Sequence, residues 1–252
     1  MKKDKLFPTN FYLKDNYLLN YNIDKELFFN KDKLNEYVIN SLKEYGQSSM
    51  KEYLLCESNC FDVEKRRTTR NFSNKVVSYK EISSILNVLS KRIYDGLLYA
   101  NYPSAGGLYP VDVYLYVKDK RVECIDSGIY KYNSLENKII KINNNVITKK
   151  EHFFSNKNVF ESSAFSLLMV SNIKRATIKY GEMGYYFSIL EVGILIELLS
   201  YYCEKNLLGS CCIGNFDFKK IDSLLNLTKD QVPISIMEIG HKEVNYEEDN
   251  KY

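Results

Sequence analysis

The chain has 252 residues, of which 45% are hydrophobic and 27% are charged, a composition that excludes an intrinsically disordered protein. Its 35 basic and 32 acidic residues give a formal net charge of +3, which offers no argument for nucleic-acid binding or membrane binding. Because only two histidines are present, a three-histidine metal site is impossible, and we expect no metal.

The N-terminal part of the chain is predicted to be an arm or small appendage over residues 1–60, which are rich in Lys, Asn, Asp and Tyr. Within it, apolar residues recur at helical spacing over residues 32–45, which predicts a helix. We expect the main domain over residues 61–245 and a polar tail over residues 246–252. The basic residues at the start are not followed by an apolar run, so we expect no secretory signal and a cytoplasmic protein.

Helices and strands alternate along the main domain, which predicts an α/β or α+β class with a mainly antiparallel or mixed sheet. Residues 78–92 are predicted to form an amphipathic helix with Ser78 as its N-cap and Glu81 three residues later. Apolar runs rich in Val, Ile and Tyr predict strands, and two short alternating runs predict a hairpin. The predicted strand segments are 111–117, 128–143, 165–171 and 233–239.

The longest apolar stretch, residues 186–203, is predicted to be a buried helix of a soluble protein. It contains Glu191 and Glu197, and two charges inside the stretch would be costly in a bilayer. The cysteines are predicted to be reduced thiols, because no close pair has the spacing of a zinc knuckle. They are Cys56, Cys60, Cys124, Cys203, Cys211 and Cys212.

Two segments stand out by residue type. Residues 66–70 (RRTTR) combine three guanidinium groups with two hydroxyls, which suits a phosphate group but is also typical of a solvated basic surface. Residues 103–110 (PSAGGLYP) contain two of the 11 glycines and two of the four prolines. Such a concentration indicates an unusual backbone shape, which either lets a flat ligand approach closely or makes a tight turn into the next strand.

Two other segments are less distinctive alone. In residues 207–217 (LLGSCCIGNFD), Gly209 is a natural helix C-cap, and Gly214 and Asn215 offer backbone N–H groups to a ligand or belong to a plain connection. The pair Lys179 and Tyr180 suits proton transfer, but Lys-Tyr also occurs elsewhere in this chain. Only the position of the pair, between the predicted central strand and the long helix, favours a functional interpretation.

In this order and spacing, the four segments resemble the nitroreductase-like flavoproteins over residues 62–242. They are most similar to the SagB-type branch, the FMN-dependent azoline dehydrogenases that act in the biosynthesis of thiazole/oxazole-modified peptides. The resemblance implies a nitroreductase-like α+β fold, with a central, mainly antiparallel or mixed sheet flanked by helices. It also implies a homodimer with FMN in the subunit interface and the long buried helix at that interface.

The resemblance also implies roles for individual residues. Lys179 and Tyr180 correspond to the pair that the branch is thought to use catalytically. The residues implied to bind FMN are Arg66, Arg67, Thr68 and Arg70 at its phosphate and ribityl chain, Ser104, Ala105 and Gly106 along the cofactor, and Gly214 and Asn215 near the isoalloxazine. Classical nitroreductases add basic residues near the C-terminus, for which only Lys242 and Lys251 are available here, and that contact stays open.

The implied activity is the oxidation of a peptide thiazoline or oxazoline to the aromatic azole, as in bacteriocin biosynthesis. Lys179 and Tyr180 would remove the acidic ring proton, and FMN would take the electrons. The expected partners are a precursor peptide, a second copy of the chain and a cyclodehydratase complex, without nucleic acid or membrane insertion. Two alternatives are an NAD(P)H-dependent FMN nitroreductase or quinone reductase, and a flavin-binding, non-catalytic subunit of a peptide-modifying complex.

Overall fold

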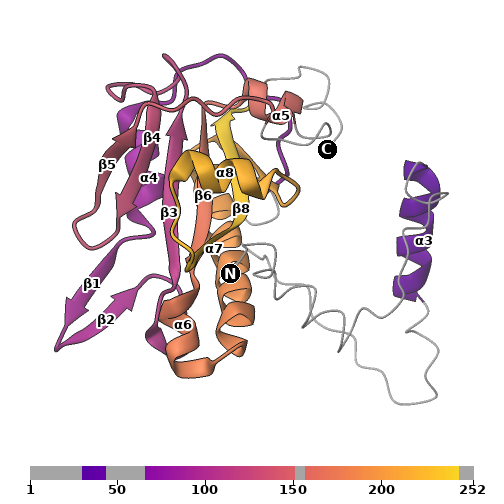
Figure 1. Ribbon diagram of the computed structural model, residues 1–252. Coiled ribbons are helices and arrows are strands. Elements are labelled where there is room, and N and C mark those ends of the chain that lie inside the picture. The colour runs from indigo at the N-terminus through magenta and orange to yellow at the C-terminus, as the bar shows by residue number, and fades with distance from the viewer. Residues whose placement is uncertain (1–29, 44–65, 151–156, 244–252) are drawn as a thin grey trace. The chain divides into compact units, whose positions relative to one another are not determined.

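Figure 1 shows the computed structural model, which describes residues 30–43, 66–150 and 157–243. The chain divides into two compact units, Met1–Cys60 and Phe61–Tyr252. In the first unit the described residues form helix α3 (Lys31–Lys43), which confirms the helix predicted at residues 32–45 up to residue 43. The last two residues of that prediction, and the predicted polar tail, lie outside the described residues.

A six-stranded antiparallel sheet forms the centre of the second unit, with the strand order β5-β4-β3-β6-β8-β7. This arrangement confirms the predicted α+β fold, and all the predicted strand segments contribute to the sheet. The strands are β3 (Val111–Val117), β4 (Gly128–Asn133), β5 (Lys138–Asn143), β6 (Phe165–Asn172), β7 (Leu208–Ile213) and β8 (Gln231–His241). Strand β6 contributes to the core on both faces of the sheet, which explains the continuous apolar run in its sequence.

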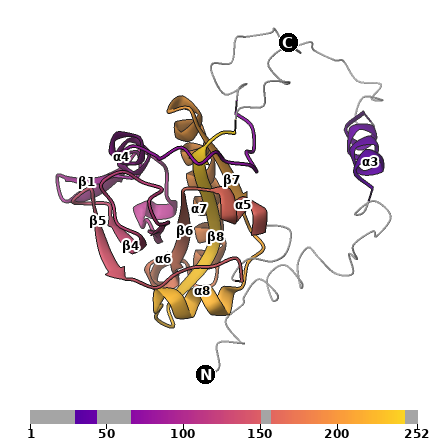
Figure 2. The ribbon, with the colours of Figure 1, turned by 90° about the horizontal axis from the view of Figure 1, so that it is seen from above.

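Helices cover both faces of this sheet, as Figure 2 shows. The helices are α4 (Tyr79–Asn87) and α7 (Met183–Lys205) on one face, and α5 (Lys157–Ser162) and α8 (Phe218–Leu225) on the other. Strand β3 supplies both cores: Val113 and Leu115 join the first, and Tyr114 and Tyr116 join the second. This division follows from the two-residue period of side chains along a strand.

Helix α4 begins as predicted but ends earlier. The Ser78 Oγ accepts a hydrogen bond from the Glu81 backbone N–H at 3.2 Å, and the Glu81 carboxylate accepts one from the Ser78 N–H at 2.7 Å, a complete capping box. The prediction of helix up to residue 92 is wrong, because Lys91–Tyr94 (β1) and Leu97–Ala100 (β2) form an antiparallel hairpin. An Asp-Gly turn with positive φ at both residues joins the two strands, and this is a strong hairpin signal.

Helix α7 is buried on one face only. Val192, Leu195 and Leu199 pack against the sheet, whereas Tyr186, Leu190 and Ile194, which we call the α7 stripe, are 39%, 47% and 37% exposed. The predicted burial of this helix is therefore met on the face that packs on the sheet, and the implied dimer interface falls on the opposite, exposed face. By length and composition alone, α7 is the one helix among the described residues that could cross a membrane, a test that the core helix of a soluble protein also passes.

The role predicted for Gly209 is wrong. Asn206 is the C-cap of α7, and Gly209 lies inside strand β7 opposite Gly240 of β8. The other edge of β7 is covered by the arginine-rich segment: Thr68 forms a parallel bridge with Ser210, and the Thr69 N–H donates to the Ser210 carbonyl at 2.9 Å. An apolar helix followed by a glycine has the local pattern of a helix C-cap. Strand β7 forms because it pairs with β8, which is distant in sequence, so the local pattern does not reveal it.

The cysteines in the described part of the chain are free. Cys203 and Cys211 are buried, and Cys124 and Cys212 are exposed. Cys56 and Cys60 lie outside the described residues. The free thiols agree with the prediction that these cysteines are not part of a disulfide framework.

Candidate functional site

Two of the segments predicted to be functional meet at one end of the sheet. Val111 at the start of β3 pairs with Ser171 near the end of β6, so the loop before β3 and helix α6 (Ile173–Tyr180) after β6 lie together. A Cβ atom built on Gly106 would lie 2.8 Å from the Lys179 Nζ and would also clash with the Tyr180 hydroxyl. The structure therefore brings the glycine-containing loop against the lysine and tyrosine side chains.

Lys179 and Tyr180 present their polar ends beside this loop. Lys179 is exposed, and its Nζ lies 5.3 Å from the centre of the Tyr180 ring. The Tyr180 ring is half-buried and packs edge-to-face on Phe187 of α7, with 5.0 Å between the ring centres. An amine and a phenol that both reach an accessible surface can hold or move a proton on a molecule bound there.

Residues 104–109, which we call the glycine loop, have an unusual backbone. Gly106 and Gly107 have φ values of 61° and 67°, and Tyr109 has a φ of 45°. The Gly107 N–H donates to the Ser104 carbonyl at 3.0 Å, and the Tyr109 N–H donates to the Ser104 Oγ at 2.9 Å. The glycine loop is therefore a tight turn, and its glycines occupy positions where left-handed backbone geometry is required.

Two residues outside the predicted site set contact this loop. The buried Glu191 of α7 accepts a hydrogen bond from the Ser104 Oγ, and Arg175 of α6 donates to the Tyr109 carbonyl at 2.8 Å. Burial raises the pKa of Glu191, and the hydrogen bond from Ser104 opposes that rise. The one signal in the sequence for Glu191 is that it is an acid inside a long apolar stretch, a place where a carboxylate is costly unless it has a partner.

The arginine-rich segment lies elsewhere, along the edge strand β7. A Cβ built on Gly209 would lie 2.6 Å from the Cβ of Thr69, so the glycine allows the segment to approach the strand closely. Arg67, Thr68 and Arg70 are exposed and Arg66 is half-buried. Burial raises the pKa of the Cys211 thiol, while the positive charge of Arg70 lowers it, which indicates that this guanidinium lies near β7.

The predicted site residues therefore form two sets. Ser104, Ala105 and Gly106 lie with Lys179 and Tyr180 at the start of β3. Residues 66–70 lie along β7, and Gly214 and Asn215 are exposed just beyond the end of that strand. Strands β6 and β8 separate β3 from β7, so three strand spacings place the two strands roughly 14 Å apart.

The C-terminal phosphate contact that the sequence left open finds no support in Lys242. Its Nζ lies 2.7 Å from each carboxylate oxygen of Glu204, so this side chain already has an ionic partner. Lys251 lies outside the described residues.

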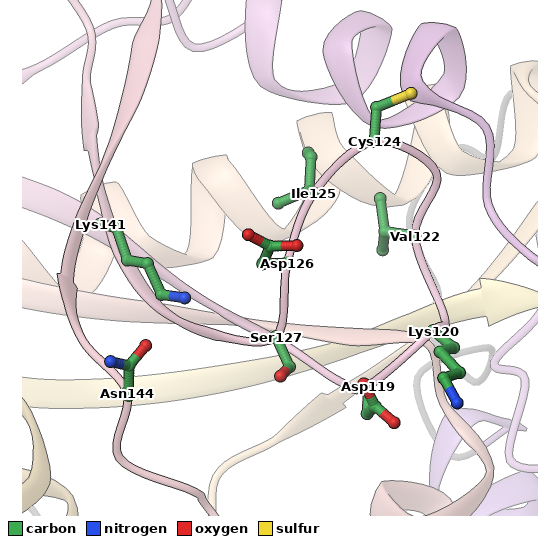
Figure 3. Close-up of a pocket in the computed structure, with 9 residues that line it drawn as sticks. All are labelled: Asp119, Lys120, Val122, Cys124, Ile125, Asp126, Ser127, Lys141 and Asn144. Atoms are coloured by element: carbon green, nitrogen blue, oxygen red, sulfur yellow. The ribbon is translucent and has the colours of Figure 1, made fainter.

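A cavity of about 790 Å³, shown in Figure 3, lies away from both sets. Its lining side chains come from the β3–β4 connection, from β5 and from the residue after β5. This connection follows the last residue of β3, whereas the glycine loop precedes the first, so the length of β3 puts roughly 20 Å between them. The cavity contains no residue that the sequence predicted to be functional, and the described residues contain no cluster of three or more potential metal ligands.

The chain is similar to known proteins over the part that contains both sets. Residues 63–241 match the model of the nitroreductase family. A Methanocaldococcus jannaschii protein, provisionally named a nitroreductase, is 27% identical over 179 residues, which are 71% of this chain and 88% of that protein.

Solved structures show the same fold. A chain of the Escherichia coli microcin synthetase McbBCD complex, solved with truncated pro-MccB17 bound, has a TM-score of 0.66 at 18% identity, and 82% of each chain is covered. A nitroreductase-like protein from Ralstonia eutropha has a TM-score of 0.57 at 18% identity, covering 78% of this chain and 88% of the other. The predicted family and fold are confirmed, and the chain belongs to the nitroreductase family of oxidoreductases.

Proposed function

We propose that this protein is an FMN-dependent dehydrogenase that oxidises thiazolines or oxazolines in a ribosomal peptide to thiazoles or oxazoles. The observation that carries the proposal is the approach of Lys179 and Tyr180 to Gly106, which puts two groups capable of proton transfer beside an open stretch of backbone. The similarity in fold to a chain of a peptide-bound microcin synthetase complex supports a peptide substrate and a partner complex.

The residues present fit FMN, which members of this family commonly bind. Arginine side chains along β7 suit the phosphate, because a guanidinium can donate two parallel hydrogen bonds to its oxygens. A Cβ built on Gly107 or Gly214 would meet no atom within 4 Å, so the backbone at both positions is open to a flat ligand. In this proposal residues 66–70 hold the phosphate, and the glycine loop with Gly214 and Asn215 lines the ring system.

A homodimer with the α7 stripe at its interface is part of the proposal. The stripe is an exposed apolar surface on the helix whose opposite face packs on the sheet. It begins at Tyr186, next to Phe187, which packs on Tyr180. Pairing two stripes would remove apolar surface from water close to the candidate site.

The protein's own part in the reaction is proton transfer. In an azoline, the ring hydrogen on the former Cα is acidified by the adjacent imine and carbonyl groups, so an amine or a phenolate can remove it. Lys179 and Tyr180 would take this proton from a ring that rests beside Gly106, and the exposed position of Lys179 gives a bulky peptide access. When bound, FMN supplies the two-electron acceptor for the remaining oxidation.

The test compares the variants Lys179→Ala and Tyr180→Phe with the wild type on an azoline peptide, using mass spectrometry to detect the loss of two hydrogens. We expect both variants to stay yellow with bound FMN and to form azole about 100-fold more slowly, the usual size of a proton-transfer contribution. The matched control is Lys174→Ala, which removes an exposed lysine from the same helix. Wild-type conversion rates in both variants would show that this pair is not the base.

A second candidate function is an NAD(P)H-dependent reductase of nitroaromatics or quinones, because the Methanocaldococcus jannaschii relative carries a nitroreductase name. Rapid bleaching of the bound flavin by NAD(P)H without oxygen, together with no turnover of azoline peptides, would favour this function over the dehydrogenase.

A further inference from the structure

We propose that Glu191 and Arg175 are positioning residues that hold the glycine loop at the distance from Lys179 and Tyr180 that the reaction needs. The catalytic role of that pair rests on the proposed function, whereas the holding of the loop rests on contacts of this chain alone. Glu191 and Arg175 lie on different helices, and each contacts a different end of the loop.

Glu191 fixes the first end of the loop. One carboxylate oxygen accepts a hydrogen bond from the Ser104 Oγ, and the other accepts the Val111 N–H at 3.4 Å. The Ser104 Oγ also accepts a hydrogen bond from the Tyr109 N–H at 2.9 Å, so Ser104 connects the Glu191 carboxylate to the end of the loop. Through these bonds Glu191 of α7 holds the start of the loop, its end and the start of β3. Glu191 is 2% exposed, and a buried carboxyl is tolerated only where such hydrogen bonds satisfy it.

Arg175 fixes the second end of the loop. It donates to the Tyr109 carbonyl at 2.8 Å and to the Asp112 carboxylate at 2.7 Å. Lys131 of β4 lies 3.3 Å from the other oxygen of Asp112 and adds to this ion pair. Arg175 precedes Lys179 by four residues in α6, so both side chains lie on one face of the same helix. The helix that carries the proposed base is therefore tied to the loop that the base faces.

These two contacts act on a backbone that costs free energy to hold. Tyr109 has a φ of 45°, a left-handed conformation that residues other than glycine rarely adopt. Its N–H donates to the Ser104 Oγ, which in turn donates to Glu191, and its carbonyl accepts a hydrogen bond from Arg175. Without either anchor, the loop can relax away from Lys179 and Tyr180 while the sheet and its two cores remain. The expected defect is therefore local.

The experiment measures backbone amide hydrogen exchange by NMR in the full chain, without flavin or substrate. The variants Glu191→Leu, Arg175→Met and Ser104→Ala should raise the exchange rates of the Gly107, Leu108 and Tyr109 amides at least about tenfold. The rates of the Leu167 and Met169 amides in β6 should stay unchanged. Glu191→Gln should keep loop exchange slow, because its carbonyl oxygen still accepts the Ser104 hydroxyl. The matched control is Glu161→Gln, which removes an exposed carboxylate paired with Lys149 on the other face of the sheet.

A double variant shows whether Ser104 and Glu191 act through their shared hydrogen bond or whether each change weakens the loop independently. Ser104→Ala combined with Glu191→Leu should loosen the loop less than the sum of the two single changes, because both remove the hydrogen bond between Ser104 and Glu191. With bound FMN and an azoline peptide, Glu191→Leu should lower kcat at least about tenfold with little change in KM. Glu191→Gln should keep most of the wild-type kcat.

Wild-type exchange of the loop amides in Glu191→Leu and Arg175→Met would overturn the proposal, as would equal loosening by Glu191→Gln and Glu191→Leu. Should Glu191→Leu not fold, Ser104→Ala decides the same point, because it breaks the bond from the loop side. The exchange measurement does not depend on the reaction. If the anchors prove real while Lys179→Ala keeps full activity, the proposed function fails and the anchoring stands.

Discussion

Gly106 connects the glycine loop to the side chains that face it. Its position could be expected from the sequence, since two glycines between two prolines in a glycine-poor chain indicate a special backbone. Its contacts could not, because Lys179 and Tyr180 are more than 70 residues away along the chain. The same holds for Glu191 and Ser104, which are 87 residues apart and meet only after the sheet forms.

At this scale we predict that Gly106→Ala impairs the reaction far more than Gly107→Ala. Both substitutions put a side chain at positive φ and should lower the free energy of unfolding by about 1 kcal/mol. Only the methyl group at residue 106 would push against the Lys179 Nζ and the Tyr180 hydroxyl, since a Cβ at Gly107 meets nothing within 4 Å. Azole formation should be at least about tenfold slower in Gly106→Ala than in Gly107→Ala, with urea unfolding measured on both. Equal rates would mean that the close approach has no catalytic importance.

Among the elements, strand β7 and the arginine-rich segment along its edge show where local patterns mislead. The apolar helix followed by Gly209 has the signature of a helix C-cap, yet the glycine lies in a strand and is needed because Thr69 packs directly against it. The strands with strong apolar periodicity, such as β3 and β6, were predicted correctly because their local pattern and their burial agree.

The close contact between Gly209 and Thr69 can be tested by mutation. Gly209→Ala should displace the arginine-rich segment, because the new methyl group would lie 2.6 Å from both the Cβ and the Cγ2 of Thr69. Since residues 66–70 are proposed to hold the phosphate, we expect FMN to bind about tenfold more weakly in a fluorescence titration. Adding Thr69→Gly removes the clashing atoms and should restore part of the affinity. An unchanged affinity for FMN in Gly209→Ala would show that the arginine-rich segment does not bind the flavin.

On the scale of the whole molecule, the main result is that one antiparallel sheet carries both sets of predicted site residues, one at the start of β3 and one along β7. The helix beneath the sheet keeps an apolar stripe exposed. The resemblance to the nitroreductase-like flavoproteins implies a dimer interface at this helix, and an exposed apolar stripe is the surface that such an interface would cover.

The proposed dimer interface on the α7 stripe can be tested by placing a charge in it. Leu190→Glu puts a charge in the middle of the α7 stripe and should shift the protein to a monomer in sedimentation velocity, because burying an unpaired carboxylate is costly. The control Leu135→Glu changes a leucine that is 53% exposed in the β4–β5 turn and should leave the oligomeric state unchanged. A monomeric wild type would show that the protein does not form this dimer. A dimer that survives Leu190→Glu would show that the interface lies elsewhere.

The sequence by itself determined the class of fold, the strands and helices with strong periodicity, the capping of α4 and the family, because these depend on local patterns of apolar residues and on short motifs. Only the tertiary structure decided that Gly106 lies against Lys179 and Tyr180 and that Gly209 leaves space for Thr69. It also decided that Glu191 and Arg175 form hydrogen bonds with the glycine loop. Those contacts join residues from different strands and helices. Their existence depends on strand order and on how the elements pack, which no local pattern in the sequence encodes.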